Sequence, residues 1–170
     1  MEAKKIHDLD IVLLGGLYGS GKTIVSKKYF MNKGRYRVSR SELRKLIFEM
    51  TNFGKPWKEE YFSEETDFIV KHVERKLIEQ FLHDRKKVLV INTFVSEKSR
   101  KKFVSIAKEM KKTIGIIFLN TPIKKCLENN EKSPTKVTVQ VINSLYNQIK
   151  LPVKSEGFDE VLIIDDQASQ

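Results

Sequence analysis

Short apolar runs alternate along this chain with longer stretches in which apolar residues recur at helical spacing. The runs resemble strands that are buried on both faces of a sheet, and they span residues 10–15, 36–39, 87–93, 113–119 and 158–164. The stretches between them predict helices over residues 23–31, 41–50, 63–85, 96–111, 121–127 and 137–149. This alternation predicts one α/β domain over residues 1–170, with a roughly five-stranded parallel sheet covered by helices on both faces.

Apolar stripes on three of these helices indicate which side should face the protein interior. The stripes comprise Leu43, Leu46, Ile47 and Met50 in the first helix, Phe68, Val73, Leu77 and Phe81 in the second, and Val141, Leu145 and Ile149 in the third. Residues 1–5 are polar, and we expect them to be frayed.

Two further segments are expected to be loops. Residues 51–57 contain a glycine and a proline, and residues 128–136 are polar and contain Pro134. The aromatic residues of the first loop, Phe53 and Trp57, either pack against the hinge or line a site for a nucleobase, and packing is the simpler expectation.

The turn after the first strand carries the clearest chemical signal. Residues 16–23 read GLYGSGKT, which fits the phosphate-binding P-loop pattern G-x-x-x-x-G-K-[ST]. Its glycines let successive backbone N–H groups converge on phosphate oxygens, and the following helix adds its positive end. A chance glycine turn is the alternative, but the octapeptide lies between a strand and a helix, as the mechanism requires.

This pattern predicts binding of ATP or GTP together with Mg²⁺. Lys22 is expected to reach the outer phosphates, and the Thr23 hydroxyl is expected to hold the metal. The nucleotide-binding residues are Gly16, Gly19, Ser20, Gly21, Lys22 and Thr23.

In parallel sheets, ligands bind beyond the carboxyl ends of the strands, so the residues that follow the other strands are also informative. After the second strand come Arg40, Ser41, Glu42 and Arg44. Arg44 can clamp an acceptor phosphate, and Glu42 is the nearest carboxylate able to act as a base. Alternatively, Arg44 is an exposed helix residue and Glu42 an ordinary acid in a first helical turn.

Weaker candidates follow the third strand and lie in the second loop. Asn92 and Thr93 can hydrogen-bond a substrate hydroxyl or a water molecule. Lys132 and Lys136, in the lid-like loop of residues 128–136, can supply cations over the transferred phosphoryl group. A solvated loop without a catalytic part is an equal alternative.

The composition adds a possible partner. The formal net charge is +10 with 32 Lys and Arg residues, which favours RNA, DNA or an anionic membrane surface as a partner. A charged surface of the kind found in heat-adapted proteins explains the same numbers equally well. Cys126 is the single cysteine, so an intramolecular disulfide is excluded and a buried or incidental thiol is expected. Because we find neither a signal peptide nor a membrane-spanning run, we expect a cytoplasmic protein without a membrane partner.

Taken together, five segments resemble the P-loop kinases related to phage-type 5′-hydroxyl polynucleotide kinase. They are GLYGSGKT, YRVSRSELR, VLVINTF, the helix that begins with Thr121-Pro122, and EGFDEVLIID. The resemblance implies the three-layer P-loop fold and transfer of the γ-phosphate of ATP to a hydroxyl, in the best-known members the 5′-OH of RNA or DNA. It also implies that Arg44 contacts the acceptor phosphate.

The chain departs from this family in three places. Ser41 stands where the family carries its general-base Asp, Asn92 stands where an acid often follows the third strand, and lysines replace the arginines of the lid. Loss of a general base typically costs 10²–10⁴-fold in rate. Three functions therefore stay open: an active 5′-hydroxyl polynucleotide kinase, a nucleotide- and RNA-binding module that has lost phosphotransfer, and a P-loop kinase of a small molecule or a tRNA-linked group. The acceptor, the choice between ATP and GTP, and the oligomeric state are not determined at this level.

Overall fold

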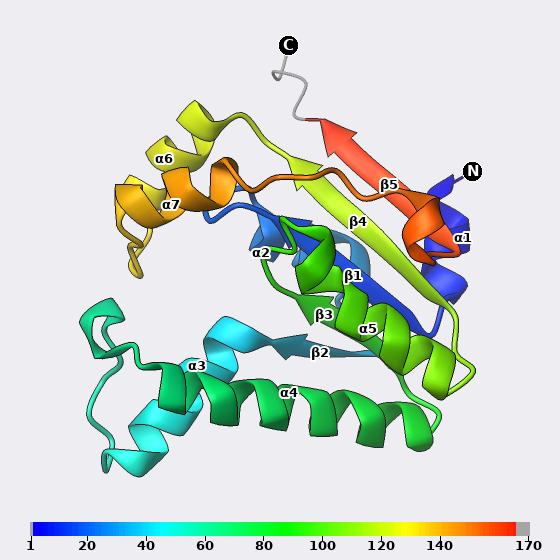
Figure 1. Cartoon of the computed structure of the whole chain (residues 1–170), viewed down its shortest axis with the longest axis horizontal. Helices are drawn as coiled ribbons and strands as arrows, with labels where there is room; N and C mark the ends of the chain where they lie inside the picture. The colour runs from blue at the N-terminus through cyan, green and yellow to red at the C-terminus, as the bar shows by residue number, and fades with distance from the viewer. Residues whose placement is uncertain (1, 166–170) are drawn as a thin grey trace.

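A computed structural model of the chain describes residues 2–165. Within that range, five parallel strands form one sheet in the order β2-β3-β1-β4-β5 (Figure 1). The strands are β1 (Ile11–Gly16), β2 (Arg35–Ser39), β3 (Lys87–Ile91), β4 (Ile114–Asn120) and β5 (Glu160–Asp165). The predicted parallel α/β sheet is confirmed, and each strand lies within about two residues of its expected range.

Helices cover both faces of this sheet (Figure 1). They are α1 (Glu2–Asp8), α2 (Lys22–Phe30), α3 (Arg40–Thr51), α4 (Glu64–His83), α5 (Glu97–Glu109), α6 (Ile123–Glu131) and α7 (Val139–Tyr146), with 3₁₀ turns η1 (Glu59–Tyr61) and η2 (Lys154–Glu156). The expectation that residues 1–5 are frayed is wrong for residues 2–5, because α1 begins at Glu2, and residue 1 lies outside the described residues. This helix is held by the apolar residue Ile6, which is buried against the sheet.

The core divides into two layers because alternate residues of β1 point to opposite faces of the sheet. Ile11 and Leu13 belong to the layer under α4 and α5, whereas Val12 and Leu14 belong to the layer under α1 and α2. All four side chains are at most 1% exposed. This two-sided burial is the physical reason for the uninterrupted aliphatic run in the sequence.

The predicted helix stripes are only partly correct. Leu46, Met50 and Phe68 are exposed, whereas Phe48 is buried. Helix α3 does not lie flat on the sheet: its Phe48 ring stacks on Tyr61 and contacts Trp57, both from the connection that follows. Periodicity identifies an apolar face, but a loop that folds back over the helix can change which face is covered.

The second predicted loop is shorter than expected, because α6 continues to Glu131. The side chain of Asn130 is buried, donates to the carbonyl of Val137 at 2.8 Å and accepts from its N–H at 3.0 Å. The lid-like segment is therefore a loop between α6 and α7 whose two ends are joined by the hydrogen bonds between Asn130 and Val137. None of the helices within residues 2–165 combines the length and the apolar character needed to cross a membrane.

Candidate active site

The turn between β1 and α2 has the shape of a phosphate-binding loop. Gly16, Gly19 and Gly21 have φ angles of 141°, 78° and 95°, in the region that favours glycine. A β-carbon on Gly19 would lie 2.2 Å from the carbonyl oxygen of Cys126, which belongs to α6. At this position, the turn tolerates a hydrogen atom and nothing larger.

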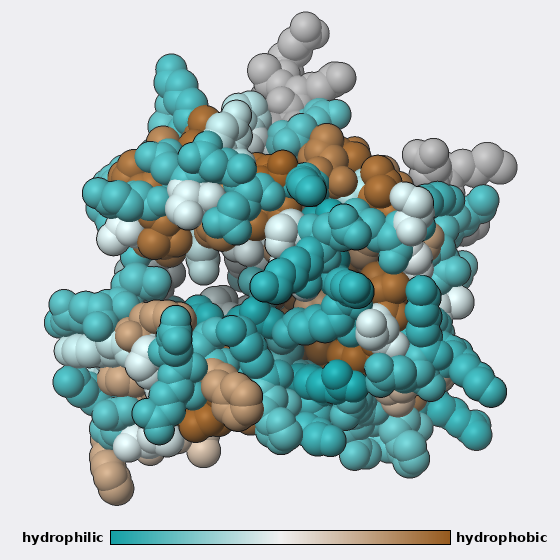
Figure 2. Space-filling view, viewed as in Figure 1, coloured by the Kyte–Doolittle hydropathy of each residue, from teal (hydrophilic) through white to brown (hydrophobic). Residues whose placement is uncertain are grey.

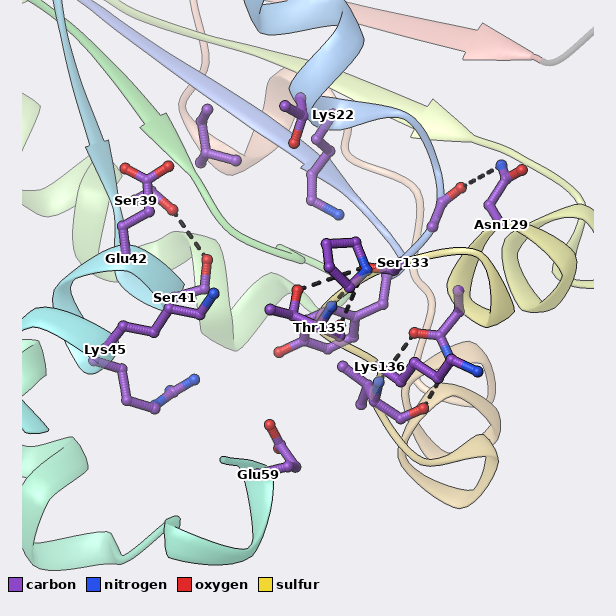
Figure 3. A pocket seen from close by; sticks show the side chains of 18 of the residues that line it. Lys22, Ser39, Ser41, Glu42, Lys45, Glu59, Asn129, Ser133, Thr135 and Lys136 are labelled. Carbon is purple, nitrogen blue, oxygen red and sulfur yellow. Dashed lines mark hydrogen bonds between the residues drawn. The ribbon is translucent and has the colours of Figure 1, made fainter. Parts of the chain in front are cut away.

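Helix α6 and the residues before it brace this turn from outside. The Thr121 hydroxyl donates to the carbonyl of Ser20 at 3.1 Å. The Asn129 amide donates to the carbonyl of Gly19 at 2.8 Å (Figure 3). Cys126 is fully buried beneath the turn, as expected. The loop is therefore preorganised by contacts from residues more than 100 positions away in sequence.

The lysine of the P-loop pattern lies inside the curve of the turn. The Lys22 ammonium donates to the carbonyls of Gly16 and Leu17 at 2.7 and 2.6 Å. Burial lowers the pKa of Lys22 to about 8. Thr23 is exposed and lines the adjoining cleft. Backbone N–H groups, one ammonium and one hydroxyl form a donor set that suits a Mg²⁺–triphosphate, because Mg²⁺ usually keeps waters and phosphate oxygens and takes few protein ligands.

A cleft of about 750 Å³ opens in front of the P-loop. Its walls come from four places: the P-loop, the β2–α3 junction, the α3–η1 connection and the α6–α7 loop. Figure 2 shows the molecule hollowed between the α3 side and the α6–α7 side, and Figure 3 shows side chains from these walls pointing toward one another.

Ser41 and Glu42 both line the wall formed by the start of α3 (Figure 3). The Ser41 hydroxyl shares a 3.1 Å hydrogen bond with the Ser39 hydroxyl. Glu42 is exposed, and its two carboxylate oxygens lie 2.8 and 2.9 Å from one guanidinium nitrogen of Arg37. A carboxylate is thus present at the cleft, although the family position of the base holds a serine.

Arg44 lines the same wall and is held from behind by α4. Its guanidinium lies 2.5 Å from the carboxylate of Asp67, which also accepts from Lys71 at 2.8 Å. Burial alone would raise the pKa of Asp67, but hydrogen bonds from Lys71 and Arg44 outweigh it and lower the pKa below its ordinary value. The ionised Asp67 carboxylate therefore fixes the direction of Arg44.

The structure does not bring three of the other candidates to the cleft. Arg40 turns toward α4, where its guanidinium lies 2.5 Å from the fully buried carboxylate of Glu74. Asn92 accepts a hydrogen bond from the backbone of Thr93 at 2.8 Å, and the Thr93 carbonyl accepts from Gly16 at 2.9 Å. The second of these bonds ties the segment after β3 to the end of β1, whereas the first is local. None of the three side chains lines the cleft.

The two lid candidates differ. Lys136 lines the cleft and pairs with Glu131 at 3.0 Å, whereas Lys132 is exposed outside it. Ser133 and Thr135 from the same loop also line the cleft (Figure 3).

Several cleft residues were not singled out from the sequence. They are Tyr18, Arg37, Lys45, Lys58, Glu59 and Asn129. Tyr18 lies within the variable part of the P-loop pattern, and burial raises its pKa, so it stays a neutral phenol. Arg37 lies two residues before Ser39 in β2. Because side chains alternate along a strand, both face the same side, and this alternation could have identified Arg37 from the sequence. Lys58 and Glu59 come from the segment after α3, whereas Lys45 and Asn129 lie on α3 and α6. No local sequence pattern specifies that these segments meet at the cleft.

Comparison with known proteins identifies the class. A family model described as an AAA domain (AAA_33) matches residues 11–152, so the chain belongs to this family of P-loop domains. The five-stranded parallel sheet with helices on both faces is the P-loop kinase-like fold.

Individual relatives are more distant. The chain is 25% identical over 150 residues to an L-seryl-tRNA(Sec) kinase of Methanococcus maripaludis, a match that covers 88% of this chain and 56% of that protein. Its fold is similar to a structure of the Pnkp1/Rnl/Hen1 RNA repair complex, with a TM-score of 0.65, 19% identity, and coverage of 81% of this chain and 43% of that one. It is also similar to a gluconokinase from Sinorhizobium meliloti 1021, with a TM-score of 0.60, 16% identity, and coverage of 93% and 83%. The chain spans about half the length of the first two.

Proposed function

We propose that this protein is an ATP-dependent kinase that transfers the γ-phosphate to a hydroxyl at the 5′ end of RNA or DNA. One observation carries the proposal: the P-loop faces a wall with Glu42 and Arg44 across a single cleft of about 750 Å³. A nucleotide-binding module without phosphotransfer needs only the first of these walls.

The donor side of the cleft accounts for the phosphates of ATP. The N–H groups of Gly16 and Ser20 already donate to the carbonyls of Thr93 and Leu17. The backbone N–H groups of residues 19 and 21–23 and the Lys22 ammonium would therefore hold the phosphate chain, and Thr23 would hold Mg²⁺. The metal, when bound, supplies charge neutralisation at the transferred phosphoryl group. Lys136 extends this positive environment from the opposite loop.

The acceptor side needs a group that orients or deprotonates the attacking hydroxyl. Glu42 is our first candidate because it lies in the first turn of α3, one residue after the position where the family carries its Asp. Its pairing with Arg37 involves two exposed side chains, so exchange of that partner costs little. Glu59 is a second carboxylate that lines the cleft, and Figure 3 shows it at the far end of the α3 wall. Ser41 can donate a hydrogen bond but is a poor base.

The acceptor also needs cations for its own phosphate. Arg44 lines the cleft and is held by Asp67, and Arg37 and Lys45 line the same wall. A planar guanidinium locked in position suits bidentate contact with a phosphate. A simple sugar acceptor would leave these cations without a role.

A tRNA-linked hydroxyl is the second candidate. The 25% identity to a seryl-tRNA kinase over 88% of this chain favours it. Both candidates place nucleic acid at the acceptor wall, and they differ in whether the attacking hydroxyl belongs to a ribose or to an aminoacyl group.

Transfer of label from γ-labelled ATP tests the proposal. We expect label on 5′-OH RNA or DNA oligonucleotides in the presence of Mg²⁺, none after chelation with EDTA, and none with Lys22→Ala. Label on seryl-tRNA alone would support the second candidate, and label on gluconate alone would overturn both. ATP binding without transfer to any acceptor would indicate a binding module.

Paired variants test the base. Glu42→Gln should lower kcat by about 10²-fold or more if Glu42 is the base, whereas Glu59→Gln should change it little. The reverse result would assign the role to Glu59. If both variants keep the kcat of the unmodified protein, neither carboxylate acts as a base.

A further inference from the structure

We infer that Trp57 is a stacking platform for a nucleobase of the acceptor strand. This inference rests on the proposed function, because it names how the same cleft recognises nucleic acid. Trp57 lies on the connection between α3 and η1, and it lines the cleft.

The indole ring is held from one side. It meets the ring of Phe48 edge to face, with centroids 5.3 Å apart and planes at 79°. Phe48 is buried and stacks in turn on Tyr61, with centroids 5.1 Å apart and planes within 5°. Three aromatic rings thus form a rigid support, and Trp57, only partly buried, is the member at the cleft. A ring fixed in this way loses little conformational entropy when a base stacks on it.

Cations lie along the same wall. Lys45 and Lys58 line the cleft with Trp57, and Arg44 is fixed nearby by Asp67. An aromatic face combined with a positively charged groove is the arrangement by which proteins bind single-stranded nucleic acid. The bases stack on the ring, while the cations accompany the backbone.

The other aromatic residue of this loop does not share these features. Phe53 is fully exposed, with a relative accessibility of 101%, and it does not line the cleft. The expectation that both aromatics pack against the hinge is therefore wrong for Phe53. For Trp57 the two alternatives are compatible, because one part of the ring packs and another part lines the site.

The position of Trp57 favours the acceptor over the nucleotide. Its connection also carries Lys58 and Glu59, and it continues the wall that holds Ser41, Glu42 and Arg44. Figure 3 shows Glu59 of this connection across the cleft from Lys22 of the P-loop. A base on Trp57 would thus belong to the molecule that approaches from the α3 side.

Fluorescence provides a direct test, since Trp57 is the single tryptophan of the chain. We expect quenching on titration with a 5′-OH trinucleotide, weaker quenching with a trinucleotide that is abasic at the 5′ position, and little quenching with ATP and Mg²⁺. Quenching by ATP alone would overturn the inference and place the donor base on the ring. Equal quenching by the intact and abasic strands would also overturn it, because no base would then be stacked.

Kinetics supply the second measurement. Trp57→Leu should raise the KM for the oligonucleotide about tenfold relative to the KM for ATP, whereas Trp57→Phe should recover part of the loss. Phe53→Leu, in the same loop, is the matched control and should leave both constants unchanged. Thermal melting of each variant separates these effects from unfolding.

The outcomes distinguish the inference from the function beneath it. Label transfer to oligonucleotides with an unchanged KM in Trp57→Leu would overturn the stacking role and leave the kinase function intact. Base-dependent quenching without label transfer would support the stacking role in a binding module. Absence of both quenching and transfer would overturn both.

Discussion

At the scale of single residues, the P-loop depends on the absence of one side chain. Gly19 has a positive φ of 78° and lies against the backbone of α6, where a β-carbon would approach the Cys126 carbonyl to 2.2 Å. Neither backbone can yield without disturbing the hydrogen bonds from Thr121 and Asn129 that hold the turn.

We therefore expect Gly19→Ala to weaken binding of ATP with Mg²⁺ by at least about tenfold, measured by calorimetry, since the N–H groups would no longer converge on the phosphates. Gly34→Ala is a matched control, because Gly34 also has a positive φ, 67°, but a β-carbon there would meet nothing within 4 Å. Equal losses of affinity in the two variants would show that backbone strain, and not the shape of the cradle, controls binding.

Asp67 has a different role, because it acts through another residue. It fixes Arg44 at 2.5 Å while a second cation, Lys71, contacts it from the exposed side. The carboxylate is nearly buried, and Lys71 is about half exposed.

Asp67→Asn should lower kcat/KM for the nucleic acid acceptor by up to about a hundredfold, because a displaced guanidinium no longer meets the acceptor phosphate. The KM for ATP should stay within about twofold, since Arg44 lies on the acceptor wall. Lys71→Gln keeps the Arg44 contact and should have little effect. If Lys71→Gln impairs the acceptor reaction as strongly as Asp67→Asn, the role of Asp67 in holding Arg44 is contradicted.

At the scale of elements, three helices meet around one buried charge. Glu74 of α4 is fully buried and contacts Arg40 of α3 at 2.5 Å and Lys102 of α5 at 3.0 Å. Its other carboxylate oxygen and the Nε of Arg40 are buried without a hydrogen-bond partner within residues 2–165. Such a group fixes how the helices are arranged and contributes less to stability than its short contacts suggest.

Glu74→Ala should lower the free energy of unfolding by about 3–5 kcal/mol, because it leaves the largely buried guanidinium of Arg40 without its carboxylate. Glu79→Ala, which removes a partly exposed partner of Arg75 on the same helix, should cost no more than about 1 kcal/mol. Urea unfolding monitored by circular dichroism measures both. A double variant, Arg40→Met with Glu74→Leu, should recover much of the loss, and a loss in the double variant equal to that in Glu74→Ala would contradict the argument.

These elements also mark what the sequence could and could not predict. The strands were predictable because burial on both faces leaves an aliphatic run such as residues 11–14. The P-loop was predictable because its chemistry requires glycines at fixed spacing. The direction of Arg40 was not, since its partner Glu74 lies 34 residues away and no local pattern links them. The same holds for Trp57, whose support by Phe48 depends on the path of a loop.

At the scale of the whole molecule, the feature that bears on binding of nucleic acid is the formal net charge of +10. Much of it is paired: at the cleft itself, Arg37, Arg44 and Lys136 each contact a carboxylate. Net charge therefore overstates how many cations are available to a polyanion. The position of a cation, more than its number, should decide whether it contributes to binding.

Salt dependence separates these possibilities. If single-stranded nucleic acid binds along the α3 wall, the affinity for a 5′-OH oligonucleotide should fall linearly on a plot of log K against log salt, with a slope of about −0.7 for each phosphate neutralised. Lys45→Gln should make the slope shallower by about 0.7 because Lys45 lines the cleft. Lys98→Gln removes the same charge from an exposed position on α5, outside the cleft, and should leave the slope unchanged. Equal changes of slope in the two variants would mean that the whole basic surface attracts the strand without a defined path, and a slope near zero in the unmodified protein would exclude phosphate contacts as the source of affinity.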